Sequence, residues 1–118
     1  MANFRDLIVW QKAMRLVILI YQLVRALPNE EKFGLCDQMR RAAVSIPSNI
    51  AEGQARKTPQ SYKDFSRFLL IAQGSRAELE TQIEICIQLQ YITAEQAKEP
   101  LALCEEISRM LRVLIQTT

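Results

Sequence analysis

The chain contains very few residues that can end a regular element of secondary structure, with only three glycines and four prolines among 118 residues. An all-β fold needs a turn about every 8–12 residues, so this scarcity disfavours it. The length suits one domain, residues 1–118, which can bury roughly two-thirds of its unfolded surface in a single core. We therefore expect long helices joined by short connections.

Apolar residues recur at steps of three and four along four segments, which is the spacing of amphipathic helices. In the first segment the recurring residues are Leu7, Trp10, Met14, Val17, Ile18, Tyr21 and Val24. We expect helices over about Asp6–Leu27, Lys32–Ala55, Thr58–Gln90 and Thr93–Thr118. The link between the last two, Tyr91-Ile92, is too short for anything except an antiparallel hairpin.

Polar residues at the expected helix starts indicate where the helices begin. Asp6 is expected to cap the first helix, and Thr58 followed by Pro59 is a start signal for the third. Thr93 and Gln96 have the spacing of a capping box at the start of the fourth.

Pro47 lies inside the second segment. It has no N–H and clashes with the carbonyl of Ala43, which predicts a kink rather than a break, because the helical period resumes at Ile50. Four amphipathic helices with short loops predict an all-α fold, an antiparallel up-down-up-down four-helix bundle with a kinked second helix.

Charge is unevenly distributed along the chain, although its net value is only +2. Residues 39–77 hold seven basic and two acidic residues, and residues 78–106 hold seven acidic residues and one lysine. Such asymmetry can mean an anion-binding face. It can equally mean two segments that neutralise each other across a packed interface, and the sequence leaves both open.

The second expected helix has a continuous polar stripe opposite its apolar side. At 100° per residue, this stripe contains Gln38, Arg41, Ser45, Asn49, Glu52 and Arg56.

Small residues cluster on the same helix, and a second small patch on the third helix includes Gly74 and Ser75. Because a glycine in mid-helix costs roughly 1 kcal/mol relative to alanine, we expect the two helices to approach closely there. Glu78 should then lie within reach of Arg40 or Arg41, and Gly53 should loosen the end of the second helix.

Catalytic and metal-binding patterns are missing from the sequence. There is no histidine, the usual general base, and no Gly-rich phosphate loop after a strand. Glu80 and Glu84 could hold a divalent ion, but solvated carboxylates are the favoured interpretation. The three cysteines form no C-x-x-C motif, and reduced cysteines fit a reducing cytoplasm. The sequence also shows no signal-peptide pattern and no apolar run long enough to span a membrane. We expect a cytoplasmic protein with no catalytic residues, no cofactor and no metal.

Three stretches are specific enough to suggest a family. "FRDLIVWQKA", "LCDQMRRAAVSIPSNIAEGQAR" and "FSRFLLIAQGSRAELETQIEI" closely resemble the four-helix bundle proteins of the 23S ribosomal RNA intervening-sequence family, over about residues 4–92. The matching motif positions are Trp10, Gln38, Arg40, Arg41, Ser45, Pro47, Asn49, Glu52, Gly53, Arg56, Gly74, Ser75 and Glu78. The last expected helix is similar to the family only in character.

The resemblance implies an antiparallel four-helix bundle, usually assembled as a ring-like homopentamer. More distant relatives are the accessory variability determinants of diversity-generating retroelements, which bind nucleic acid and a reverse transcriptase. The resemblance gives none of the motif residues a catalytic role. The total charge of this chain is milder than that of the strongly basic relatives, which weakens transfer of their activity.

Two hypotheses of function follow. In the first, the protein binds RNA or DNA through backbone phosphates, with Arg56, Lys57, Lys63 and Arg67 as the candidate contacts. In the second, it is an adaptor oligomer that docks a protein partner such as a reverse transcriptase. The polar residues expected to serve packing and assembly in that case are Gln38, Arg40, Arg41, Ser45, Asn49, Glu52 and Glu78.

Overall fold

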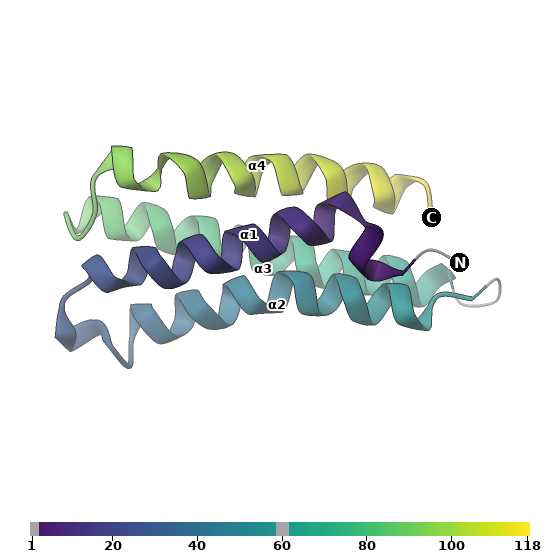
Figure 1. The fold of residues 1–118 in the computed structure, drawn as a ribbon, viewed down its shortest axis with the longest axis horizontal. Helices are drawn as coiled ribbons and strands as arrows, with labels where there is room; N and C mark the ends of the chain where they lie inside the picture. Colours follow the sequence, from purple (N-terminus) through teal and green to yellow (C-terminus); the bar gives the residue numbers. More distant parts are fainter. Residues whose placement is uncertain (1–2, 59–61) are drawn as a thin grey trace.

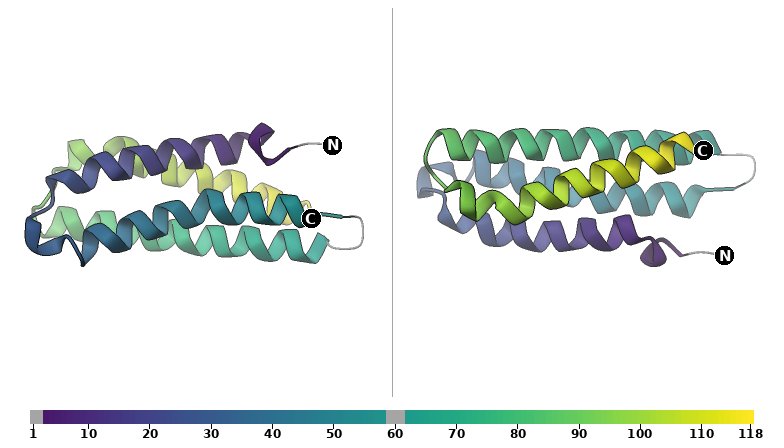
Figure 2. Two further views of the ribbon diagram at one scale, coloured as in Figure 1. Left: turned by 60° about the horizontal axis from the view of Figure 1, so that its bottom comes forward. Right: turned by 90° about the horizontal axis from the view of Figure 1, so that it is seen from above.

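Four long helices run alternately in opposite directions in the computed structural model, which describes residues 3–58 and 62–118 (Figure 1). They are α1 (Ile8–Leu23), α2 (Leu35–Arg56), α3 (Tyr62–Gln88) and α4 (Ala94–Gln116). η1, the end of α2, the start of α3 and the end of α4 lie at one end of the bundle, and the α1–α2 and α3–α4 connections lie at the other (Figures 1 and 2). The predicted all-α, up-down-up-down bundle is confirmed.

Short 3-10 turns precede and follow α1: η1 (Phe4–Asp6), η2 (Val24–Ala26) and η3 (Asn29–Glu31). The prediction that Asp6 caps the first helix is wrong. Asn3 caps η1 by accepting from the N–H of Arg5, and the Asp6 carboxylate accepts from the N–H of Asn3 at 3.2 Å. Asp6 therefore belongs to the capping box of η1 rather than to the start of α1. α1 begins after the extended residue Leu7 without a side-chain cap.

The buried face of α1 differs in part from the predicted one: Val24 is buried and Trp10 and Val17 pack against the core, as expected. The residues that enter the core are Val9, Ala13, Leu16, Ile20 and Leu23. Met14, Ile18 and Tyr21 are instead 40–53% exposed. Because α1 is apolar on nearly every side, more than one helical stripe satisfies the periodicity, and packing against α2 and α4 decides which stripe is buried.

α2 and α3 form the most extensive helix pair. The apolar residues of α3 that recur at helical spacing, and were expected in the core, are all buried: Phe65, Leu69, Ala72, Leu79, Ile83 and Cys86. α2 continues without a break through Pro47, which is itself buried. The axis of α2 changes direction in its middle part (Figure 2, left).

The predictions for Gly53 and Gly74 are both wrong. A Cβ atom on Gly53 would lie 2.8 Å from Phe68 Cβ and 3.2 Å from Phe65 Cδ1, whereas one on Gly74 would meet nothing within 4 Å. Gly53 thus permits close approach of α3 rather than loosening α2, and Gly74 faces outward, so its predicted role in close packing is wrong.

The boundaries of α3 and α4 follow local signals. The Thr93–Gln96 capping box at the start of α4 is confirmed, with the Thr93 hydroxyl accepting from the N–H of Gln96 at 3.1 Å. The expected start of the third helix involves Pro59, which lies outside the described residues. In the parts of the chain that the structure describes, no helix is long and apolar enough to cross a membrane.

The three cysteines, Cys36, Cys86 and Cys104, are free and buried. Burial raises the pKa of the Cys86 thiol to about 11 and that of Cys104 to about 12. An unfolded thiol titrates near 8.5, so above about pH 8.5 the unfolded chain releases protons that the native chain retains. This stabilising contribution is complete below that pH and is lost as pH rises towards the native pKa values.

We expect the free energy of unfolding to fall between pH 8 and pH 10.5, measured by denaturant titration. A Cys86→Ala/Cys104→Ala variant should show a flatter dependence, because it lacks both thiols. An equal decline in this variant and the wild type would show that other groups cause the loss.

Candidate functional site

The polar stripe of α2 meets α3 at its middle. Ser45 Oγ and Ser75 Oγ lie 2.8 Å apart, and Asn49 Nδ2 donates to the Ser45 carbonyl at 2.8 Å and to its hydroxyl at 2.9 Å. These short side chains let the two backbones approach, which confirms that the helices cross near the small residues. Ser45, Asn49 and Ser75 are only half-buried, so the network lies at the edge of the helix pair.

The arginines at the start of the stripe do not reach Glu78, in contrast to the prediction. Arg41 Nε donates to Asp37 one turn earlier at 3.2 Å, and the Arg40 guanidinium lies 5.9 Å from the Tyr21 ring centroid on α1. Glu78 instead accepts from Gln82 Nε2 on its own helix at 3.3 Å. Arg41 and Glu78 thus have partners on their own helices, and Arg40 has its partner on α1 rather than α3. Gln38 is exposed on the same polar stripe of α2.

The four predicted phosphate contacts lie together where α2 ends and α3 begins. Lys57 Nζ lies 4.7 Å from the Phe65 ring centroid and 5.3 Å from that of Tyr62. The guanidinium carbons of Arg56 and Arg67 lie 5.4 and 5.2 Å from the Phe68 centroid. Two carboxylates accompany them, because Arg56 pairs with Glu52 and Arg67 with Asp64. Lys63 is exposed beside them.

The phenylalanines of this cluster belong to the core. Phe65 is 1% and Phe68 8% exposed, whereas Tyr62 is 46% exposed. Buried rings cannot stack on nucleic-acid bases, but they hold the aliphatic stems and charged heads of the basic residues at the rim. The arrangement therefore favours contact with charge over reading of bases.

Topology adds three further cations that the sequence analysis did not include. Arg5 follows the N-terminus, and Arg109 and Arg112 lie near the end of α4, so all three belong to the same end of the bundle as the α2–α3 connection (Figure 1). We call this set the basic end: Arg5, Arg56, Lys57, Lys63, Arg67, Arg109 and Arg112. These residues are far apart in sequence, and only the alternating helix directions bring them to one end.

The two ends of the bundle differ in charge. Residues 3–7, 52–58, 62–68 and 109–118 at the basic end hold seven basic and three acidic side chains. Residues 24–34 and 84–99 at the opposite end hold three basic and five acidic side chains. Four of the seven basic residues of segment 39–77 lie at the basic end, whereas Arg40 and Arg41 lie toward the opposite end of α2.

The basic segment (residues 39–77) and the acidic segment (residues 78–106) form few ion pairs with each other. Glu99 and Glu106 of the acidic segment pair with Arg15 and Lys12 of α1. Within the described residues, Arg76–Glu80 is the ion pair that joins the two segments. The basic residues of the α2–α3 corner are therefore not cancelled by the acidic segment.

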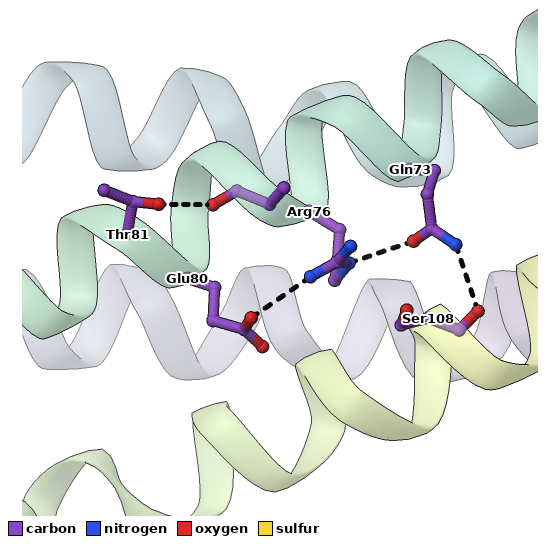
Figure 3. Close-up of polar contacts among 6 residues, drawn as sticks. Gln73, Arg76, Glu80, Thr81 and Ser108 are labelled. Carbon is purple, nitrogen blue, oxygen red and sulfur yellow. Dashed lines mark hydrogen bonds and ion pairs between the residues drawn. The ribbon is translucent and has the colours of Figure 1, made fainter.

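A half-buried polar network joins α3 to α4 (Figure 3). Arg76 Nε donates to Gln73 Oε1 at 2.9 Å and its Nη1 to Glu80 Oε2 at 3.1 Å, while Gln73 Nε2 donates to the Ser108 carbonyl at 3.1 Å. The Arg76 side chain is 14% exposed. A role in packing follows from this burial, so Arg76 is not part of the candidate binding surface.

Replacing Arg76 with alanine should lower the free energy of unfolding by about 1–3 kcal/mol, because Gln73 and Glu80 would lose their shared donor. The matched control is Arg15→Ala, since Arg15 also pairs with a glutamate at 2.9 Å but is 57% exposed. That exposed pair should contribute less than about 1 kcal/mol. Equal losses in denaturant titrations of the two variants would contradict the importance of burial.

The sequence suggests Glu80 and Glu84 as possible ligands of a divalent ion. Glu80 and Glu84 line an open groove with Glu105, but residues 3–58 and 62–118 contain no group of three or more His, Cys, Asp or Glu that could hold a metal ion. Glu80 is engaged by Arg76.

Comparisons with known proteins agree with this architecture. Residues 5–113 match the sequence profile described as 23S rRNA-intervening sequence protein. A crystal structure of a protein of unknown function from the S23 ribosomal protein family of Bacteroides thetaiotaomicron VPI-5482 superposes with a TM-score of 0.81. It is 33% identical, and the match covers 92% of this chain and 98% of that one. No curated protein matches the chain.

Proposed function

The chain belongs to the 23S rRNA-intervening sequence protein family, and we propose that this member is a non-enzymatic cytoplasmic protein whose basic end binds the phosphate backbone of RNA or DNA. The observation that supports this most strongly is the concentration of seven cations at one end of a bundle whose net charge is only +2. Basic side chains near phosphates release condensed counterions, which favours binding without reading the sequence.

The proposal includes assembly into a homo-oligomer, with a pentamer as the expected form. Exposed apolar side chains support it: Ile8, Met14 and Ile18 of α1 and Val44 of α2 are 40–57% exposed. An oligomer would present every basic end several times, so that weak contacts add through avidity.

Lysine footprinting tests where nucleic acid binds. Lys57 and Lys63 belong to the basic end, whereas Lys98 lies at the opposite end and serves as the internal control. Acetylation of the protein with and without an RNA hairpin, read by mass spectrometry, should show protection of Lys57 and Lys63 only. Equal protection of all three lysines, or of none, would count against the basic end as the binding surface.

The second candidate is an adaptor oligomer that docks a protein partner, such as a reverse transcriptase, without binding nucleic acid. The same exposed apolar side chains of α1 and α2 favour it. In this case the basic end would have no ligand of its own, and the polar stripe of α2 would serve subunit contacts.

Arg41→Ala separates assembly from folding. Its side chain is 80% exposed and its pair with Asp37 spans one helical turn, so the protomer should lose less than about 0.5 kcal/mol. If the α2 stripe forms subunit contacts, the oligomer mass measured by light scattering should fall while the helical circular dichroism stays. An unchanged mass would show that Arg41 is outside the interface.

A further inference from the structure

A groove of about 440 Å³ lies where α1 turns through η2 and η3 into α2, at the end opposite the basic end. Its lining includes Tyr21, Arg25, Pro28, Lys32, Cys36 and Arg40. Three cationic side chains from α1–η2, the η3 turn and α2 thus converge on one hollow. No carboxylate belongs to the lining, although this end of the bundle is acidic overall.

None of the three cations has an ion-pair partner among the described residues. Asp37 pairs with Arg41, while Glu31 accepts from two neutral donors, the Leu35 N–H at 3.2 Å and the Tyr91 hydroxyl at 3.0 Å. Glu30 is also close in sequence, but in the described part of the chain neither glutamate forms an ion pair with Arg25, Lys32 or Arg40. The three cations are therefore not held in direct ion pairs and can contact an added anion.

One of these cations is held in place by the fold. The Arg40 guanidinium lies over the Tyr21 ring, 5.9 Å from its centroid, and Arg40 is half-buried. Val24 and Leu27 form an apolar floor, and the Cys36 thiol donates to the Val24 carbonyl at 3.6 Å. An arginine fixed against an aromatic ring loses less side-chain freedom when it binds an anion.

We propose that this groove binds a phosphate dianion, either free or as the terminal phosphate of a small organic molecule. Three convergent cations match the charge and the several acceptor oxygens of a phosphate monoester better than the single charge of a phosphodiester. The volume lies within the range of small-molecule pockets, about 300–1,000 Å³. The site is separate from the basic end and uses none of its residues.

Isothermal titration calorimetry at constant ionic strength and about pH 8 tests the proposal with three probes: inorganic phosphate, AMP, and the dinucleotide ApA, which has only a phosphodiester. A monoester carries close to two negative charges at this pH. We expect phosphate and AMP to bind and ApA to bind at least tenfold more weakly. Tighter binding of AMP than of phosphate would identify an organic source, and equal binding would identify the phosphate group alone.

Two triple variants localise the site. Arg25→Gln/Lys32→Gln/Arg40→Gln removes the cations of the groove, and Lys63→Gln/Arg109→Gln/Arg112→Gln removes the same charge from the basic end. The first should weaken AMP binding at least a hundredfold, because each charge-assisted contact contributes roughly a tenfold change, and the second less than threefold. Circular dichroism verifies that both fold. Absence of millimolar binding by the wild type, equal losses in both variants, or ApA binding as tightly as AMP would overturn the proposal.

Discussion

Replacing Phe65 with alanine should lower the free energy of unfolding by about 3–5 kcal/mol, the usual loss for a buried aromatic side chain. Phe65 is 1% exposed and fills the space left by Gly53, where an added Cβ would lie 3.2 Å from its Cδ1. The surrounding helices cannot close the cavity without moving α2 against α3. Since domains of this size are stable by only about 5–15 kcal/mol, the variant should be close to unfolding in mild denaturant.

Tyr62→Ala is the matched control for Phe65→Ala. It removes an aromatic ring one helical turn earlier that also contacts Lys57, at 5.3 Å, but the ring is 46% exposed. Its loss should change the free energy of unfolding by about 0.5 kcal/mol or less. Denaturant titration of both variants gives the comparison, and similar midpoints would contradict the placement of Phe65 in the core.

Removing two charges at the basic end should weaken binding to an RNA hairpin about thirtyfold at 0.1 M salt. Each phosphate contact contributes about 0.7–0.9 to the slope of log K against log salt. The variant Arg56→Gln/Lys57→Gln should therefore lower this slope by about 1.5. Glutamine retains part of the aliphatic stem, so the contacts with the Phe65 and Phe68 rings are largely preserved.

The control for this variant removes two positive charges elsewhere. Arg15 pairs with Glu99 on the α1–α4 face, and Lys98 lies at the end of the bundle opposite the basic end. Arg15→Gln/Lys98→Gln should weaken binding less than threefold with an almost unchanged slope. If both double variants weaken binding equally, net charge rather than the basic end determines affinity.

The helices could be predicted well from the sequence, because a helix start and a helical apolar face both depend on residues that are close together in the chain. The capping box at Thr93 and Gln96 and the buried face of α3 follow directly from spacing. The face of α1 could not be chosen this way, since Met14, Ile18 and Tyr21 fit a helical stripe as well as the buried set does. Likewise, spacing alone could not tell that Gly53 contacts α3 and that Gly74 faces outward.

The candidate site was only partly accessible from the sequence. Arg56, Lys57, Lys63 and Arg67 are close in the chain, so their clustering could be predicted. Arg5, Arg109 and Arg112 join them only through the alternating helix directions (Figure 2). The expected Glu78 contact is not formed, since Arg41 pairs with Asp37, Arg40 lies over the Tyr21 ring and Glu78 accepts from Gln82.

The most direct measurement is a titration of a structured RNA with purified protein at several salt concentrations, with the oligomer mass determined on the same sample. Binding through phosphates predicts micromolar or tighter affinity that falls steeply with salt, by an oligomer of defined mass. A defined oligomer that does not bind RNA even at low salt would contradict the nucleic-acid function and favour the adaptor.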